Sequence, residues 1–328
     1  MKVNLSPALF LTLSLTLSLA MQSAAAIEVR DDAGNNVHLP APAHRIVTLA
    51  PHATELVFAA GAGDRIVGTV SYSDYPAAAR DIARIGSNSQ IDIERVIALK
   101  PDLLVVWLHG TASRQLEQLR GLGIPLFYSE PQRLADIPDA VMRLGQLAGT
   151  EAQARTAASA LRAQLAALEA QYRGRPPVRL FYQVWPHPLY TLNGKHIVSD
   201  AIRVCGGVNI FAGLSAVAPT VGVEAVLLEN PEAVISGDLN RKNEDGLALW
   251  RAYPALLAVQ RGNLFALDGD LLSRPGPRMI EGAAALCKSL ETARAHRTGT
   301  GTGTAASGNA AGATSASPNS PNSAAGAH

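Results

Sequence analysis

One helix–proline–strand pattern occurs twice in this chain, and the repeat limits the folds that the chain can adopt. In the first copy Glu94 stands seven residues before Pro101, and in the second Glu224 stands seven residues before Pro231. Each glutamate is followed by aliphatic residues at helical spacing, and each proline by a short run of aliphatic residues. Because proline ends a helix and an apolar, β-branched run is typical of a strand, each copy predicts the same supersecondary unit. One unit used twice predicts two similar lobes with a cleft between them, where small ligands commonly bind.

Strand and helix patterns alternate around both copies. Around the first copy, strands are predicted at residues 45–50, 65–70, 103–107 and 126–129, and helices at 54–60, 91–100 and 113–122. Around the second, strands are predicted at 178–184, 233–236 and 264–267 and a closing helix at 280–293, while residues 194–204 run into Cys205-Gly206-Gly207. Such alternation indicates parallel sheets covered by helices. We therefore predict an α/β fold with two Rossmann-like lobes and a ligand cleft between the lobes.

The most regular helix pattern, residues 151–173, lies between the two copies. Its apolar residues Leu161, Leu165 and Leu168 follow spacings of four and three, and Thr150 with Gln153 predicts a capping box. At about 1.5 Å per residue this helix would be ~35 Å long, roughly the diameter of a domain. We predict that one long α-helix joins the lobes; an ordinary surface helix within one lobe is the alternative.

These patterns divide the chain into five segments. They are a signal peptide (1–26), an N-terminal α/β lobe (27–148), the connecting helix (149–175), a C-terminal α/β lobe (176–296) and a low-complexity tail (297–328). Lys2, a short apolar stretch and the small residues up to Ala26 predict a secretory signal peptide that is cleaved after Ala26; a membrane anchor is the alternative. From residue 298 the tail has no acid, Lys or Arg, and its small polar residues predict disorder.

Composition and motifs exclude several classes of function. The formal net charge is +1 and there is no basic stripe, so nucleic-acid binding has no electrostatic basis. The sequence has no Gly-x-Ser-x-Gly, His-Glu-x-x-His, Walker or Cys-x-x-Cys motif, and Gly61-Ala62-Gly63 lacks the third glycine of a dinucleotide fingerprint. We expect a protein that is not an enzyme and has no catalytic cofactor.

The chain has two cysteines, Cys205 and Cys287. In an oxidising compartment such a pair predicts a disulfide, whereas two buried thiols are the alternative. The bond would close a loop of about 82 residues, worth ~4–5 kcal/mol in the chain-entropy model.

Aromatic side chains follow several of the predicted strands. They are Tyr72 and Tyr75 after the second strand, Trp107 (with His109) after the third, and Trp185 and Tyr190 after the fifth. In open α/β sheets the ligand lies beyond the carboxyl ends of the strands, and aromatic rings there offer large, rigid contact areas. The pattern favours a planar or bulky ligand.

Several stretches together resemble a known family. They include Ser71-Tyr72-Ser73-Asp74-Tyr75-Pro76, the segment from Glu94 to Leu103, Val204-Cys205-Gly206-Gly207 with Asn209-Ile210-Phe211, and Arg274 with Pro277-Arg278. The chain resembles the periplasmic substrate-binding proteins of ABC importers for vitamin B12, within the helical-backbone metal-chelate receptors (class III substrate-binding proteins). The resemblance spans residues 45–293.

The resemblance implies a monomeric carrier that captures cobalamin, or a related corrinoid, and delivers it to an inner-membrane permease. The implied ligand-binding residues, with Trp185 added from the strand-end pattern, are Tyr72, Asn88, Trp107, Trp185, Tyr190, Asp270 and Arg274. Glu94 and Glu224 match two glutamates that dock on permease arginines, and Cys205 and Cys287 match a paired disulfide. Asn88 and Ala218 depart from the family, which has tryptophans there, and this opens the site to other ligands.

Alternative ligands and activities stay open on the sequence alone. No protein ligand to cobalt is required, although His52 and His109 are weak candidates for an axial ligand because imidazole binds metals. A haem or ferric-siderophore carrier of the same fold is one alternative, with Tyr72 as an iron ligand. A chelatase-like enzyme, with His52 or His109 beside Asp270, is the alternative of another class.

Overall fold

A computed structural model of the chain describes residues 26–237 and 245–298. The predictions of a signal peptide and a disordered tail therefore concern residues that lie almost wholly outside the described ranges. Within those ranges, no helix combines the length and the apolar character needed to cross a membrane.

The first lobe contains a parallel sheet with the strand order β4-β3-β5-β6. The strands are β3 (Ile46–Thr48), β4 (Ile66–Thr69), β5 (Leu103–Trp107) and β6 (Leu126–Ser129), and the helices are α1 (Pro51–Ala59), α2 (Ile93–Ala98), α3 (Ser113–Arg120) and α4 (Asp136–Ala148). Short 3₁₀ turns occupy Gly63–Arg65 and Ala77–Asp81. An antiparallel hairpin of β1 (Ile27–Arg30) and β2 (Asn36–Leu39) precedes the sheet. The hairpin and α4 were not among the predicted elements.

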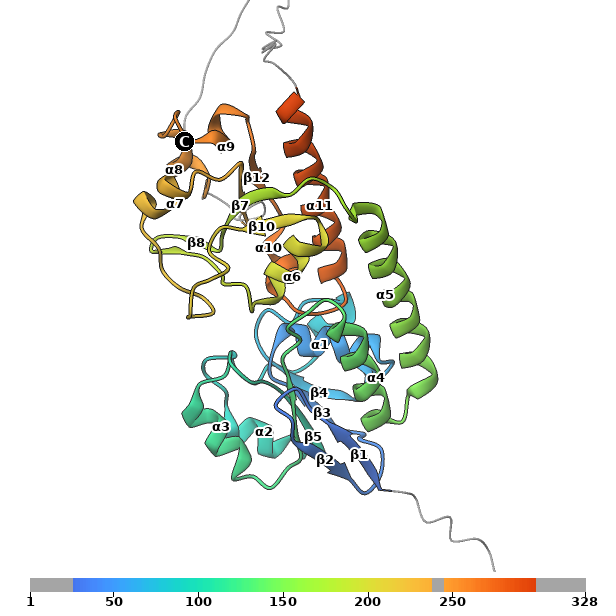
Figure 1. Cartoon of the computed structure of the whole chain (residues 1–328). Helices are drawn as coiled ribbons and strands as arrows, with labels where there is room; N and C mark the ends of the chain where they lie inside the picture. Colours follow the sequence, from blue (N-terminus) through green and yellow to red (C-terminus); the bar gives the residue numbers. More distant parts are fainter. Residues whose placement is uncertain (1–25, 238–244, 299–328) are drawn as a thin grey trace, which may run out of the picture.

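The second lobe repeats this plan with the parallel order β10-β7-β11-β12. The strands are β7 (Val178–Gln183), β10 (Gly207–Asn209), β11 (Ala233–Ser236) and β12 (Leu264–Ala266), with a small antiparallel hairpin of β8 (Trp185–Pro186) and β9 (Leu189–Tyr190). The helices are α6 (Ile197–Val204), α7 (Val223–Glu229), α8 (Ala248–Arg251), α9 (Leu257–Gln260), α10 (Gly269–Ser273) and α11 (Met279–Thr298). Figure 1 shows the two lobes one above the other, which confirms the predicted α/β fold class.

The two copies of the sequence repeat adopt the same local structure. Val96 in α2 and Val226 in α7 are fully buried and anchor their helices to the lobe cores. The residue before each proline is left-handed, with φ of 47° at Lys100 and 42° at Asn230. The chain therefore leaves both helices at the same point, and β5 or β11 begins two residues after the proline.

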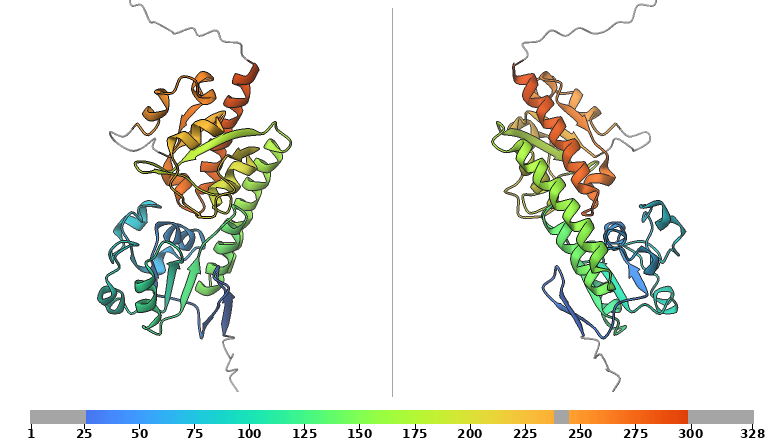
Figure 2. Two further views of the ribbon diagram at one scale, coloured as in Figure 1. Left: turned by 60° about the vertical axis from the view of Figure 1, so that its left-hand side comes forward. Right: turned by 90° about the vertical axis from the view of Figure 1, so that its right-hand side faces the viewer.

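Helix α5 (Glu151–Tyr172) connects the lobes and lies along one side of both (Figures 1 and 2). It packs on α4 and α1 of the first lobe and on α11 and α6 of the second. Gly145 on α4 allows a close approach, since a Cβ atom there would lie 2.3 Å from the Cβ atom of Ala154. The predicted capping box is wrong: the Thr150 hydroxyl caps no α5 amide and instead donates to the Ala60 carbonyl at 2.6 Å. That bond ties the start of the connector to the first lobe.

The second lobe is closed by a disulfide between Cys205, at the end of α6, and Cys287 in α11, with a Cα–Cα distance of 4.7 Å. The bond fastens the closing helix to the sheet edge, because β10 begins two residues after Cys205. Helix α11 runs five residues beyond the predicted end at residue 293.

Candidate functional site

The turn after β4 holds Tyr72 in an unusual conformation. Its φ is 65°, in the left-handed region that bulky residues avoid at a cost of ~1–3 kcal/mol, and its side chain is 77% exposed. Hydrogen bonds hold the residues on either side, because Ser71 N donates to Gly86 O at 2.8 Å and Arg84 Nη2 donates to Ser73 O at 3.0 Å. The tyrosine ring is therefore presented to solvent at the carboxyl end of the sheet by a backbone that the rest of the lobe fixes.

Trp107 ends strand β5, which is separated from β4 by β3 in the same sheet, and is held on two sides. The edge-to-face contact with His52 has ring centroids 5.5 Å apart. Gly110 lies against the indole so closely that a Cβ atom there would be 1.9 Å from the ring carbon Cε3. Asn88 Nδ2 donates to the Gly110 carbonyl at 3.3 Å, which joins the loop carrying Asn88 to this cluster. Two of the predicted ligand residues, Asn88 and Trp107, therefore share one support.

His52 is only 2% exposed, because it lies in α1 against Trp107. Burial lowers the pKa of His52 to about 4, against the opposing effect of a hydrogen bond to the Ser129 backbone, so the imidazole is neutral at pH 7. In this structure His52 therefore supports Trp107 from within the lobe, and an axial-ligand role for it stays a prediction. His109 is exposed and its Nδ1 lies 3.4 Å from Glu130. Within the described ranges there is no group of three or more side chains suited to hold a metal ion.

In the second lobe, Trp185 and Tyr190 are paired across the hairpin of β8 and β9. Their exposed fractions are 40% and 36%, so both residues are partly open to solvent. The hairpin follows directly from the carboxyl end of β7, the position that corresponds to the turns of the first lobe. Trp185 lines a hollow of about 500 Å³ with Pro186 and Leu249.

Arg274 joins the two lobes at this edge. Its Nη1 lies 2.7 Å from Asp74 Oδ1 and 3.6 Å from Glu55 Oε1, both in the first lobe, and its Nη2 lies 3.2 Å from Asp270 Oδ2 in the second. Burial raises the pKa of Asp74, but the hydrogen bond and charge of Arg274 outweigh that effect and leave the pKa below its ordinary value. The predicted ligand residues Asp270 and Arg274 therefore form an ion pair with each other, and Arg274 also pairs with Asp74 in the turn that carries Tyr72.

A second arginine, Arg278, completes this interlobe ion cluster. Its Nε and Nη2 donate to the two carboxylate oxygens of Glu55 at 3.0 and 2.6 Å. The guanidinium also lies over the Tyr75 ring, 4.0 Å from its centroid. The hydrogen bond to Glu55 raises the pKa of Arg278, with burial opposing it. Sequence reasoning missed this pairing: a single acid inside the apolar start of α1 was the available signal, but its partner lies 223 residues away.

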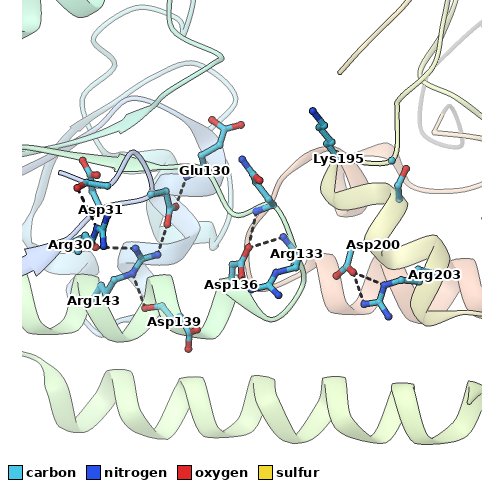
Figure 3. Close-up of a pocket in the computed structure, with 15 residues that line it drawn as sticks. Arg30, Asp31, Glu130, Arg133, Asp136, Asp139, Arg143, Lys195, Asp200 and Arg203 are labelled. Atoms are coloured by element: carbon cyan, nitrogen blue, oxygen red, sulfur yellow. Dashed lines mark hydrogen bonds and ion pairs between the residues drawn. The ribbon is translucent and has the colours of Figure 1, made fainter. Parts of the chain in front are cut away.

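A cavity with a volume of about 890 Å³ lies elsewhere between the lobes (Figure 3). None of the predicted ligand residues lines it. Most of its charged groups already pair with one another: Arg143 with Asp32 at 2.6 Å, Arg133 with Asp136 at 2.9 Å, and Arg203 with Asp200 at 2.6 Å. Asp200 in α6 also accepts from the Leu134 backbone at 2.9 Å, across the lobes. The cavity is therefore a structural junction between the lobes. It differs in this from the aromatic edge, by which we mean the exposed aromatic residues Tyr72, Tyr75, Trp185 and Tyr190 that follow the strands.

The two predicted docking glutamates occupy equivalent positions. Glu94 lies in the first turn of α2 and Glu224 in the first turn of α7, and both are exposed. They belong to different lobes and lie far from each other along the chain. In Figure 1 both helices are on the side of the molecule away from α5.

Comparisons with known proteins agree on one family. The model of periplasmic binding proteins matches residues 46–271. A vitamin B12-binding protein of Vibrio cholerae is 38% identical over 256 residues, which cover 78% of this chain and 92% of that protein. The crystal structure of the periplasmic vitamin B12 binding protein BtuF of Vibrio cholerae superposes with a TM-score of 0.72 at 37% identity, covering 77% of this chain and 98% of that one. The heme-binding protein RhuT from Roseiflexus shares the fold alone, with a TM-score of 0.67 at 23% identity and coverage of 76% and 99%.

Proposed function

Because this chain belongs to the periplasmic binding protein family, we propose that it captures cobalamin between its lobes and delivers it to an inner-membrane ABC transporter. The relatives named vitamin B12-binding proteins support this ligand over others of the same fold. We place the protein in the periplasm as a monomer, after cleavage near Ala26. It acts by binding, and no residue is assigned a catalytic role.

The observation that carries the proposal is the presentation of Tyr72. A strained backbone that holds an aromatic ring 77% exposed has no role in the core of its own lobe. Trp107 likewise ends a strand of the first lobe, and Trp185 and Tyr190 follow the carboxyl end of β7 in the second. A corrin is a large, flat ring, and aromatic faces bind such a surface with little loss of side-chain entropy.

The polar residues of the edge suit the periphery of the same ligand. Cobalamin carries amide side chains around the corrin, and these both donate and accept hydrogen bonds. Asp270 is exposed beside Arg274, and Asn88 donates to the carbonyl of Gly110, which lies against the Trp107 ring, so both supply polar groups at the predicted site. The interlobe ion cluster holds the two walls at a set distance, and we expect little closure on binding.

Titration of the purified mature protein with cyanocobalamin, followed by calorimetry and by the absorption spectrum, tests this function. We expect binding at a stoichiometry of one. Tyr72→Ala is expected to weaken it by about five- to thirtyfold, since a lost aromatic contact of this kind is worth ~1–2 kcal/mol. Val208→Ala, which trims a 46% exposed side chain on edge strand β10, is the matched control and should leave the affinity unchanged. Absence of heat and of any spectral change with the unaltered protein would end the proposal.

Delivery is a separate part of the proposal. We assign Glu94 and Glu224 to docking on basic side chains of the permease, one glutamate in each lobe. The double variant Glu94→Arg with Glu224→Arg should bind cyanocobalamin normally and fail in uptake by cells. Normal uptake by that variant would remove the docking role and leave the capture role intact.

Haem is the second candidate, because the exposed Tyr72 phenol is the kind of oxygen that binds ferric iron. A haem titration that gives a Soret band in the unaltered protein, lost in Tyr72→Phe, would favour it. Binding of cyanocobalamin, together with the absence of a Tyr72-dependent Soret band, would favour cobalamin.

A further inference from the structure

We infer that each docking glutamate acts together with an exposed aliphatic side chain one turn further along its helix, and that the two acid–aliphatic pairs fit a partner with two equivalent sites. The pairs are Glu94 with Ile97 on α2 and Glu224 with Leu228 on α7. This inference rests on the proposed delivery to a membrane permease and adds the chemistry of the surface that would receive the protein.

The exposure of the two aliphatic residues is the first observation. Ile97 is 51% exposed and Leu228 is 87% exposed, the highest value among the exposed large apolar residues of the described chain. Of the others, Tyr72, Tyr75, Trp185 and Tyr190 belong to the aromatic edge. An almost fully exposed leucine contributes nothing to the core of its own lobe, so its apolar surface is free for a partner.

The placement of each pair on its helix is the second observation. Ile97 follows Glu94 by three residues and Leu228 follows Glu224 by four, so each pair shares one face of its helix. Val96 and Val226, two residues after each glutamate, are fully buried and turn the opposite face to the core. The acid and the aliphatic group therefore point outward together in both lobes.

The repeated arrangement specifies the partner. The two pairs lie on equivalent helices of two similar lobes, both on the side away from α5 in Figure 1. A two-fold arrangement of like surfaces is matched by a partner that is itself two-fold, such as a pair of identical membrane subunits. Each half of that partner would offer a basic side chain beside an apolar pocket, since the charge orients the encounter and the apolar contact slows dissociation.

Photo-crosslinking in the source organism tests the contact without depending on the ligand. Benzoylphenylalanine is placed at position 97, at position 228 or, as a control, at position 208, where Val208 is 46% exposed on a strand edge. We expect adducts with a multi-spanning inner-membrane protein from positions 97 and 228 and none from 208. No adduct at 97 and 228, an adduct only with a second copy of this chain, or equal adducts from all three positions would each overturn the inference.

Uptake then measures the contribution of the apolar contact. We expect the double variant Ile97→Ser with Leu228→Ser to lower uptake of radiolabelled cyanocobalamin by about tenfold or more, while Val208→Ser leaves it unchanged. The cyanocobalamin affinity and melting temperature of both purified variants should match those of the unaltered protein. Unchanged uptake by the double variant would refute the role of the two side chains. If the unaltered protein failed to bind cobalamin but the crosslinks formed, the ligand assignment would fall and the docking surface would stand.

Discussion

Replacing Glu55 by glutamine is expected to destabilise the protein by about 3 kcal/mol, although the side chain keeps its size. The Glu55 side chain is 2% exposed, and its two oxygens accept from Arg278 at 2.6 and 3.0 Å. Removing one partner of a buried ion pair costs about 3–5 kcal/mol, because the other charge is left without compensation. We place Glu55→Gln at the lower end, since Arg278 is 17% exposed and the amide oxygen still accepts one hydrogen bond.

Urea unfolding followed by circular dichroism measures this change as a shift in the midpoint at constant slope. The double variant Glu55→Gln with Arg278→Met should recover much of the loss, because it leaves no lone charge and Met fills a similar volume. Asp139→Asn is the matched control: its pair with Arg162 is as short, 2.6 Å, but both side chains are more than half exposed. That control should change stability by less than about 0.5 kcal/mol. A loss below about 1 kcal/mol for Glu55→Gln, or a double variant less stable than the single one, would refute the reasoning.

Three further predictions follow from the site and its surroundings. Burial lowers the pKa of His52 to about 4, so as the pH falls the unfolded chain takes up a proton at this residue before the folded chain does. The free energy of unfolding should therefore fall by about 3 kcal/mol between pH 6.5 and pH 4 because of His52. In unfolding measured across pH, His52→Gln should make the free energy of unfolding less dependent on pH in this range. Burial raises the pKa of Glu232, but Arg297 outweighs it and leaves the pKa low. Glu232→Gln should therefore cost about 1–2 kcal/mol at pH 7, and the difference from the unaltered protein should shrink below about pH 4 in the same measurement. Gly110→Ala should displace the Trp107 ring and lower cyanocobalamin affinity by about tenfold or more in calorimetry. The control Gly213→Ala, whose added Cβ atom meets nothing within 4 Å, should leave the affinity unchanged.

The repeat and the strand pattern predicted most of the fold because they depend on local chemistry. The bounds of β5, β6 and β11 agree with the predicted ranges, since each is a short, mostly apolar run. Helix α4 was equally predictable, because Ile137, Val141 and Leu144 follow helical spacing on its buried face. The strands of the β1–β2 hairpin alternate apolar and polar residues, but each has only four residues, so the pattern is short and was overlooked.

The site was predictable only in part, because its essential pairings are long-range. Strand-end position indicated Tyr72 and Trp107 correctly as residues at the carboxyl edge of one sheet. No local pattern relates Glu55 to Arg278. The same limit explains Thr150, where a helix-cap signature was present in the sequence but a carbonyl of another helix competed for the hydroxyl.

The left-handed backbone at Tyr72 has a consequence for how this protein can evolve. Glycine or asparagine adopts that conformation with less strain, so either would make the folded chain more robust at this point. Selection for thermal stability alone would therefore favour replacing Tyr72, whereas selection for uptake of a scarce nutrient would favour keeping its ring. At residue 72, stability of the fold and affinity for the ligand therefore favour different side chains.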